Sequence, residues 1–238
     1  MSSPGNPATT TTFALIPPAA STPWYWHLVA DELRARGHGV ITMELPCADD
    51  SAGLETYADI SVHAIGDARD VVIVAQSLGA YTGTLIADRV NAQLLILLTP
   101  MIPLPGESPG DWWENTGYAQ ARQEQAVRLG WAPEQDDDPQ NVFFHELSDH
   151  MVEEVTAHAV GQSGRPFQDP LPLETWPNTP ARVLICRDDR FFPVDFLRKL
   201  TRERLHIDPD EMGGGHPVAL SRPVELADKL EEIWRDEL

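Results

Sequence analysis

The sequence has little cysteine and no long apolar run. Only two of its 238 residues are cysteines, Cys47 and Cys186, which is too few for a disulfide framework. No apolar segment is long enough to cross a bilayer, and no basic stretch leads into an apolar one as in a signal peptide. We therefore expect a cytoplasmic protein that has no membrane partner.

Positive charge is also scarce. The chain carries 17 Lys and Arg against 37 Asp and Glu, a formal net charge of -20. Such a surface repels phosphate backbones, so we expect no nucleic-acid partner and a small molecule as the ligand. Composition leaves the oligomeric state open. Residues 1–9 are small and polar, which predicts a disordered lead-in.

Strand and helix patterns alternate along most of the chain. This alternation predicts an α/β fold, with a mostly parallel, doubly wound sheet of about six strands. The predicted strands cover residues 11–16, 39–44, 71–75, 92–99, 181–186 and 205–208. The predicted helices cover residues 23–36, 54–65, 80–90, 193–204 and 222–237.

One long interval, residues 101–179, breaks this alternation because it contains no buried strand pattern. It holds many prolines, an acidic loop at 135–138, and helical stretches near 117–129 and 148–160. A structureless connection of this length is implausible in a compact domain. We therefore expect a helical cap at 101–179, inserted into a core that is formed by residues 10–100 and 180–238.

The segment from Val71 to Ala80 carries the clearest chemical signal. Four β-branched residues form a strand that is buried on both faces, and Ser77 follows it between the small residues Ala75 and Gly79. Small residues allow a strand to turn sharply into a helix, which pushes the serine hydroxyl out at the edge of the sheet. This pattern is a nucleophile elbow, with Ala75 in place of the usual first glycine.

A serine nucleophile needs a base and a group that orients the base. His216 follows the loop Gly213–Gly215 beyond the last predicted strand, which is where parallel sheets place catalytic groups. Asp188 and Asp189 both follow the strand at 181–186, and the residues themselves do not choose between them.

The order of Ser77, an acid turn and His216 resembles the α/β-hydrolase superfamily, and within it the small esterase and hydroxynitrile-lyase-like group. The resemblance covers about residues 11–236 and includes the Met-Ile-Pro-Leu-Pro-Gly-Glu stretch at 101–107. It implies that the acid lies four residues before a proline, which selects Asp189. It thus implies a triad of Ser77, Asp189 and His216.

An oxyanion hole needs two backbone N–H donors. Leu78, which follows the nucleophile, is expected to supply one of them. The second comes from the loop after the first strand, where the resembled family has His-Gly and this chain has Pro17-Pro18, neither of which can donate. Ala19 is therefore the expected second donor, and a cis peptide at the two prolines is left open.

Aromatic residues are frequent in the predicted cap and in the loops near the elbow. They predict an apolar pocket that takes small apolar or aromatic acyl or alcohol groups, with packing of cap on core as the alternative role. Gln76, beside the nucleophile, either shapes the site or packs. The predicted pocket residues are Trp24, Gln76, Trp112, Trp113 and Phe191.

Two patterns that suggest a metal or a cofactor do not fit their motifs. His145 and His150 are five residues apart, whereas a zinc-protease helix needs histidines four apart on one face. Gly213–Gly215 lacks the spacing of a dinucleotide-binding loop. We expect neither a metal nor a cofactor.

The sequence therefore predicts a serine hydrolase of the carboxylesterase kind, which cleaves an ester, lactone or thioester through an acyl-enzyme. One alternative is a cofactor-free lyase that uses the same triad for proton transfer, as the resemblance allows. A lysine near the acid turn would favour it, and the nearest is Lys199, on a predicted helix. The other alternative is a small-molecule receptor on the same scaffold.

Overall fold

The computed structural model describes residues 10–132, 135 and 138–237. The predicted lead-in at 1–9 and the centre of the predicted acidic loop, 136–137, lie outside the described residues. Among the helices that are described, none combines the length and the apolar character that a bilayer crossing requires.

The described residues form a six-stranded parallel sheet in the order β2-β1-β3-β4-β5-β6, so the predicted α/β class is confirmed. The strands are β1 (Thr12–Ile16), β2 (Gly39–Thr42), β3 (Val71–Gln76), β4 (Leu94–Leu98), β5 (Ala181–Cys186) and β6 (Asp210–Met212). The central strands β3 and β4 are buried along their whole length, because helices cover both faces of the sheet.

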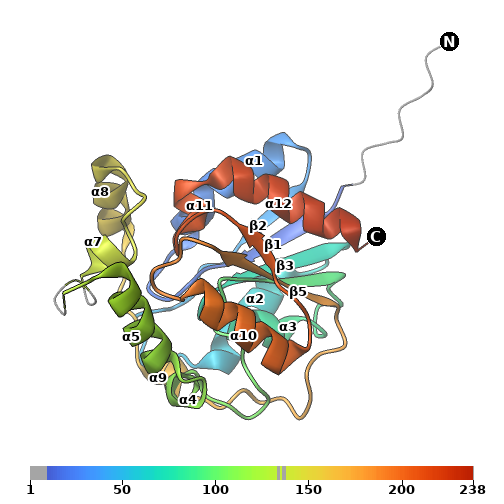
Figure 1. Cartoon of the computed structure of the whole chain (residues 1–238). Helices are drawn as coiled ribbons and strands as arrows, with labels where there is room; N and C mark the ends of the chain where they lie inside the picture. Colours follow the sequence, from blue (N-terminus) through green and yellow to red (C-terminus); the bar gives the residue numbers. More distant parts are fainter. Residues whose placement is uncertain (1–9, 133–134, 136–137, 238) are drawn as a thin grey trace.

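Helices lie on both faces of the sheet (Figure 1). One face carries η1 (Pro23–Trp26), α1 (His27–Ala35), α11 (Val218–Ser221) and α12 (Pro223–Asp236), and the other carries α2 (Leu54–Ile65), α3 (Gly79–Ile86) and α10 (Val194–Leu205). Alternation along β3 supplies both cores: Ile73 and Ala75 face one, Val72 and Val74 the other.

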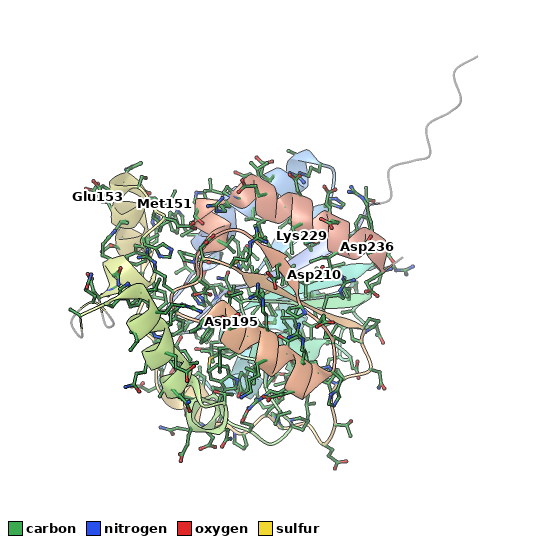
Figure 2. All side chains as sticks on the ribbon, viewed as in Figure 1. Met151, Glu153, Asp195, Asp210, Lys229 and Asp236 are labelled. Atoms are coloured by element: carbon green, nitrogen blue, oxygen red, sulfur yellow. The ribbon has the colours of Figure 1, made fainter. Side chains whose placement is uncertain are left out.

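The remaining described helices follow β4 and precede β5, and they gather at one side of the molecule (Figure 1). They are α4 (Pro109–Asn115), α5 (Tyr118–Leu129), α7 (Pro139–Val142), α8 (Asp149–His158) and α9 (Arg165–Gln168). Helix α8 has no buried residue, and Figure 2 shows Glu153 of this helix at the outer margin, far from the sheet.

The predicted sixth strand at 205–208 is wrong. Helix α10 continues through Leu205 and ends at His206 in a left-handed conformation, so the apolar residues there are the end of a helix. The strand is the polar segment β6, whose position is set by pairing with β5 and not by apolar alternation. Figure 2 shows Asp210 of β6 near Lys229 of α12, and their charged groups are 3.7 Å apart.

A charged cluster fastens α12 to the end of α1 around Glu231, which is 7% exposed. The Glu231 carboxylate accepts hydrogen bonds from His38 Nε2 at 2.8 Å and from Arg36 Nη1 at 2.9 Å. Burial raises the pKa of this carboxyl, but the two hydrogen bonds together with the nearby charges of Arg235 and Arg36 outweigh burial and hold the pKa of Glu231 below its ordinary value.

Glu231→Gln is expected to lower the free energy of unfolding at neutral pH by about 2 kcal/mol, as for a hydrogen bond to a charged group. Because the folded-state pKa lies below the unfolded one, the contribution of the carboxylate is complete at neutral pH and is lost as the pH falls through the folded-state pKa. Urea denaturation of both proteins from neutral pH down to about pH 3 should show the two stabilities converging.

The matched control is Glu232→Gln on the same helix, where the side chain is 59% exposed and pairs with Lys229. This change should alter stability by less than about 0.5 kcal/mol. A Glu231→Gln deficit that stays constant over the whole pH range would show that packing, and not charge, holds α12 at this point.

Candidate functional site

Ser77 lies in the turn between β3 and α3, with a positive φ of 53°. Its N–H donates to the carbonyl of Leu98 on β4, and its own carbonyl accepts from the N–H of Met101. A non-glycine residue in the left-handed region is strained, and neighbouring strands hold it there. The serine is therefore fixed at the carboxyl edge of the sheet, as the elbow pattern predicts.

The small residues around Ser77 are required by close packing. A Cβ at Gly79 would lie 2.6 Å from the carbonyl oxygen of Pro17, so only glycine fits between α3 and the loop after β1. A Cβ at Gly83 would lie 2.5 Å from the Cβ of Ala75. The glycine one turn further along α3 thus makes room for the alanine that replaces the first glycine of the elbow.

His216 and Asp189 are in contact. Nδ1 of His216 lies 2.8 Å from Oδ2 of Asp189, and the two residues are 6% and 1% exposed. Oδ1 of Asp189 accepts from the N–H groups of Phe191 and Phe192 at 2.8 and 2.9 Å. Because the carboxylate accepts hydrogen bonds, Nδ1 carries the proton and Nε2 is left as the basic nitrogen.

Asp188, the other candidate acid, has a different position. Its Oδ2 accepts from the N–H of Gly214 at 2.9 Å, and its own N–H donates to the carbonyl of Gly214 at 3.0 Å. Asp188 therefore holds the glycine loop, whereas Asp189 meets the imidazole.

Gln76 connects the serine turn to the histidine loop. Its Nε2 donates to the carbonyl oxygen of His216 at 2.7 Å, and the residue is fully buried. Gln76 directly precedes Ser77, so this hydrogen bond places the backbone of His216 beside the serine turn. Burial raises the pKa of the neighbouring Tyr25 far above its ordinary value, so that phenol stays neutral.

Two backbone N–H groups near Ser77 remain available. Among the described residues, neither the N–H of Leu78 nor that of Ala19 donates to a protein acceptor, whereas the N–H of Ala20 donates to Gln162 Oε1 at 3.0 Å. Gly79 approaches the Pro17 carbonyl closely, so the loop after β1, which carries Ala19, lies against the start of α3, which Leu78 precedes. All peptide bonds of the described residues are trans, so the cis alternative at the two prolines is not found.

An open pocket of about 520 Å³ lies near the imidazole, although neither Ser77 nor His216 is among its lining residues. Aromatic rings connect the two, since the rings of Phe191 and Phe143 are 5.0 and 5.7 Å from that of His216. The lining is mostly apolar, which suits an apolar or aromatic group. The pocket is lined by Trp113, Tyr118, Ala119, Arg122, Val142, Phe143 and Phe191.

The structure brings two of the five predicted pocket residues, Trp113 and Phe191, to this wall. Gln76 is buried, as described above. Trp112 is also fully buried, and its indole donates to the carbonyl of Ile102 at 2.9 Å, so it packs the first segment after β4 onto the sheet. Trp24 stacks on the ring of His158 with a centroid distance of 4.3 Å, at a separate small hollow.

The turn between α7 and α8 makes contacts with the histidine loop that the sequence does not predict. Glu146 accepts a hydrogen bond from the N–H of Gly215, and the ring of His145 lies against the same glycine. Burial lowers the pKa of His145, and the nearby charge of Arg190 lowers it further. No local pattern reveals these contacts, because Glu146 and Gly215 are 69 positions apart in the sequence.

Solved structures with the same fold include three that match nearly the whole chain. An extracellular alpha/beta-hydrolase from a Paenibacillus species, described as sharing structural and functional homology with tobacco salicylic acid binding protein 2, has a TM-score of 0.76 and 19% identity, and covers 93% of this chain and 98% of its own. Polyneuridine aldehyde esterase has a TM-score of 0.75 and 18% identity, over 94% and 99%. A pyrethroid hydrolase from Sphingobium faniae JZ-2 has a TM-score of 0.72 and 19% identity, over 95% and 98%.

No curated protein matches the sequence. The profile of the alpha/beta hydrolase family, in contrast, matches residues 13–229, which include the serine turn, the acid turn and the histidine loop. The chain belongs to the alpha/beta hydrolase family.

Proposed function

We propose that this protein is a serine hydrolase that cleaves a small apolar carboxylic ester, lactone or thioester. The observation that carries the proposal is the contact of His216 with Asp189. The side chain of Gln76, the residue before Ser77, donates a hydrogen bond to the backbone carbonyl of His216 and so holds the histidine loop beside the serine turn. The esterases and hydrolases among the solved structures of this fold agree with it.

In the proposed reaction, Oγ of Ser77 attacks the substrate carbonyl while Nε2 of His216 takes its proton. Asp189 stabilises the imidazolium and fixes the ring through Nδ1. The N–H groups of Leu78 and Ala19 bind the oxyanion. The imidazolium then protonates the leaving alkoxide or thiolate as the acyl-enzyme forms, and a water activated by His216 releases the acid and restores Ser77.

The division of the chain remains our proposal as well. We assign residues 10–100 and 180–238 to the hydrolase core and residues 101–179 to a cap. The described residues between β4 and β5 form five helices and no strand, which supports this division. Phe143 and Trp113 of the proposed cap line the pocket beside His216, which favours an apolar or aromatic acyl or alcohol group in the substrate.

The experiment that tests the proposal combines a fluorophosphonate probe with a panel of p-nitrophenyl esters and lactones of increasing acyl length. We expect one probe per chain, attached to Ser77, and turnover that favours short or aromatic acyl groups. A protein that resists the probe and turns over no ester would overturn the proposal.

Labelling without turnover of any ester or lactone would instead favour the lyase or the receptor alternative. Lys199 does not support the lyase alternative, because its side chain is 72% exposed and pairs with Glu203 on the surface of α10. An intact pair of His216 and Asp189 argues against a pure receptor, since binding alone does not need it.

We place the protein in the cytoplasm, as the sequence predicts. Cys47 and Cys186 are both free and buried, which fits a reducing compartment. Cell fractionation of the producing organism checks this location, and recovery of the protein from the medium would contradict it.

A further inference from the structure

The loop that carries His216 needs contacts that restrict its backbone conformation. Gly213–Gly215 is a run of the residue with the greatest backbone freedom, and Gly214 has a φ of +118°. A Cβ at position 214 would lie 3.0 Å from Cγ2 of Val218, so a side chain there would be crowded as well as strained in its backbone. A base on such a loop acts well only if other groups hold the loop in one conformation.

Two of these groups come from the sheet side. Asp188 exchanges two hydrogen bonds with Gly214, and Gln76 holds the carbonyl of His216. Between these two anchors, the N–H of Gly215 is the donor nearest to the histidine along the chain. Its acceptor comes from another part of the fold.

That acceptor is Glu146, in the turn between α7 and α8. Its Oε2 accepts from the N–H of Gly215 at 2.7 Å, and its Oε1 accepts from Nη2 of Arg222 at 3.0 Å. The Glu146 side chain is 19% exposed, so this charge-assisted hydrogen bond is well shielded from water. The ring of His145 closes the other side, because a Cβ at Gly215 would lie 2.9 Å from its Cε1.

We propose that Glu146 is a positioning residue, which fastens the peptide before His216 and so holds the base in place from the proposed cap. Phe143, three residues earlier, lines the pocket that we propose for the substrate. One short turn therefore forms part of the pocket wall and also accepts the hydrogen bond that holds the histidine loop. The catalytic consequence rests on the proposed function, whereas the grip on the loop does not.

The test compares Glu146→Ala, Glu146→Gln and the control Glu225→Gln by kinetics and by hydrogen exchange. Glu225 also pairs with Arg222, at 3.8 Å, but it does not touch the loop. For Glu146→Ala we expect kcat to fall by about 10- to 100-fold with KM within about threefold, because the base is misplaced while the pocket persists. Glu146→Gln keeps an oxygen acceptor for Gly215 and should recover most of kcat, and Glu225→Gln should match the wild type.

Amide exchange over residues 213–216 separates the two proposals. In Glu146→Ala it should rise by about tenfold or more, in Glu225→Gln not at all. Unchanged exchange or unchanged kcat in Glu146→Ala would overturn the role of Glu146, even if the wild type labels at Ser77. If exchange rises in Glu146→Ala but the wild-type protein is never labelled by the fluorophosphonate, the positioning role of Glu146 stands and the proposed hydrolase activity is rejected.

Should Glu146→Ala fail to fold, Arg222→Met supplies the second test. It removes the guanidinium that orients Glu146 and keeps an unbranched apolar stem against Gly214. We expect the same changes in exchange and kcat at smaller amplitude. A wild-type exchange pattern in this variant, together with wild-type kcat, would then overturn the proposal.

Discussion

Ser77→Ala is expected to lower kcat for the best ester of the panel by a factor of about 10⁴ or more, with little change in fold. We expect a large loss because, in the proposed reaction, the hydroxyl oxygen forms the bond to the acyl group and no neighbouring group replaces it. Steady-state kinetics measures the effect, and mass spectrometry should show that the variant no longer takes the fluorophosphonate.

The fold should survive this change, since alanine retains the Cβ that Ser77 already accommodates at a φ of 53°. Ser61→Ala is the matched control, because Ser61 is also buried, on α2, where its hydroxyl donates to the carbonyl of Tyr57 at 2.8 Å. This control should keep its turnover. If Ser77→Ala keeps more than about one tenth of the wild-type kcat, Ser77 is not the nucleophile, because removal of a triad member lowers kcat far more than tenfold.

Glu107→Ala is expected to lower the free energy of unfolding by about 3–5 kcal/mol, the range for breaking a buried ion pair. Glu107 and Arg204 pair with side chains 5% and 7% exposed, through two contacts, one of them at 2.9 Å. Asn115 donates to the same carboxylate at 2.9 Å. Removing Glu107 leaves the guanidinium of Arg204 buried without its counter-charge, which is the main source of the cost.

Urea denaturation measures this effect. Lys199→Ala is the control, on α10, the helix that also carries Arg204. The ion pair of Lys199 with Glu203 is exposed and should contribute less than about 0.5 kcal/mol. Glu107 lies at the start of the segment that follows β4, and its partner Arg204 lies on α10. A loss below about 1 kcal/mol, the range of a surface pair, would show that this ion pair does not anchor the segment to the sheet domain.

Much of the fold could be predicted because its signals are local. The β-branched run of β3 predicts a strand buried on both faces, and the helix predicted at 54–65 has the observed bounds of α2. The prediction failed at the edge of the sheet. There β6 is polar and short, and pairing with β5 outweighs its weak strand propensity.

The candidate site divides in the same way. The serine turn and the glycine loop follow from residue type, since each needs a backbone that few side chains tolerate. The identity of the pocket wall does not follow, because Trp112 and Trp113 are neighbours in a helix, yet one is buried and the other lines the pocket. A single rotation of α4 about its axis would exchange them.

The sequence by itself determined the order of strands and helices, the strained turn at Ser77 and the identity of the histidine loop, because each depends on residues within a few positions of one another. The family resemblance selected Asp189 over Asp188, but only the tertiary structure shows that Asp189 contacts His216 and that Glu146, 69 positions away, accepts a hydrogen bond from Gly215. Contacts between distant segments depend on how whole helices and loops pack, and a single sequence carries no periodic signal for that packing.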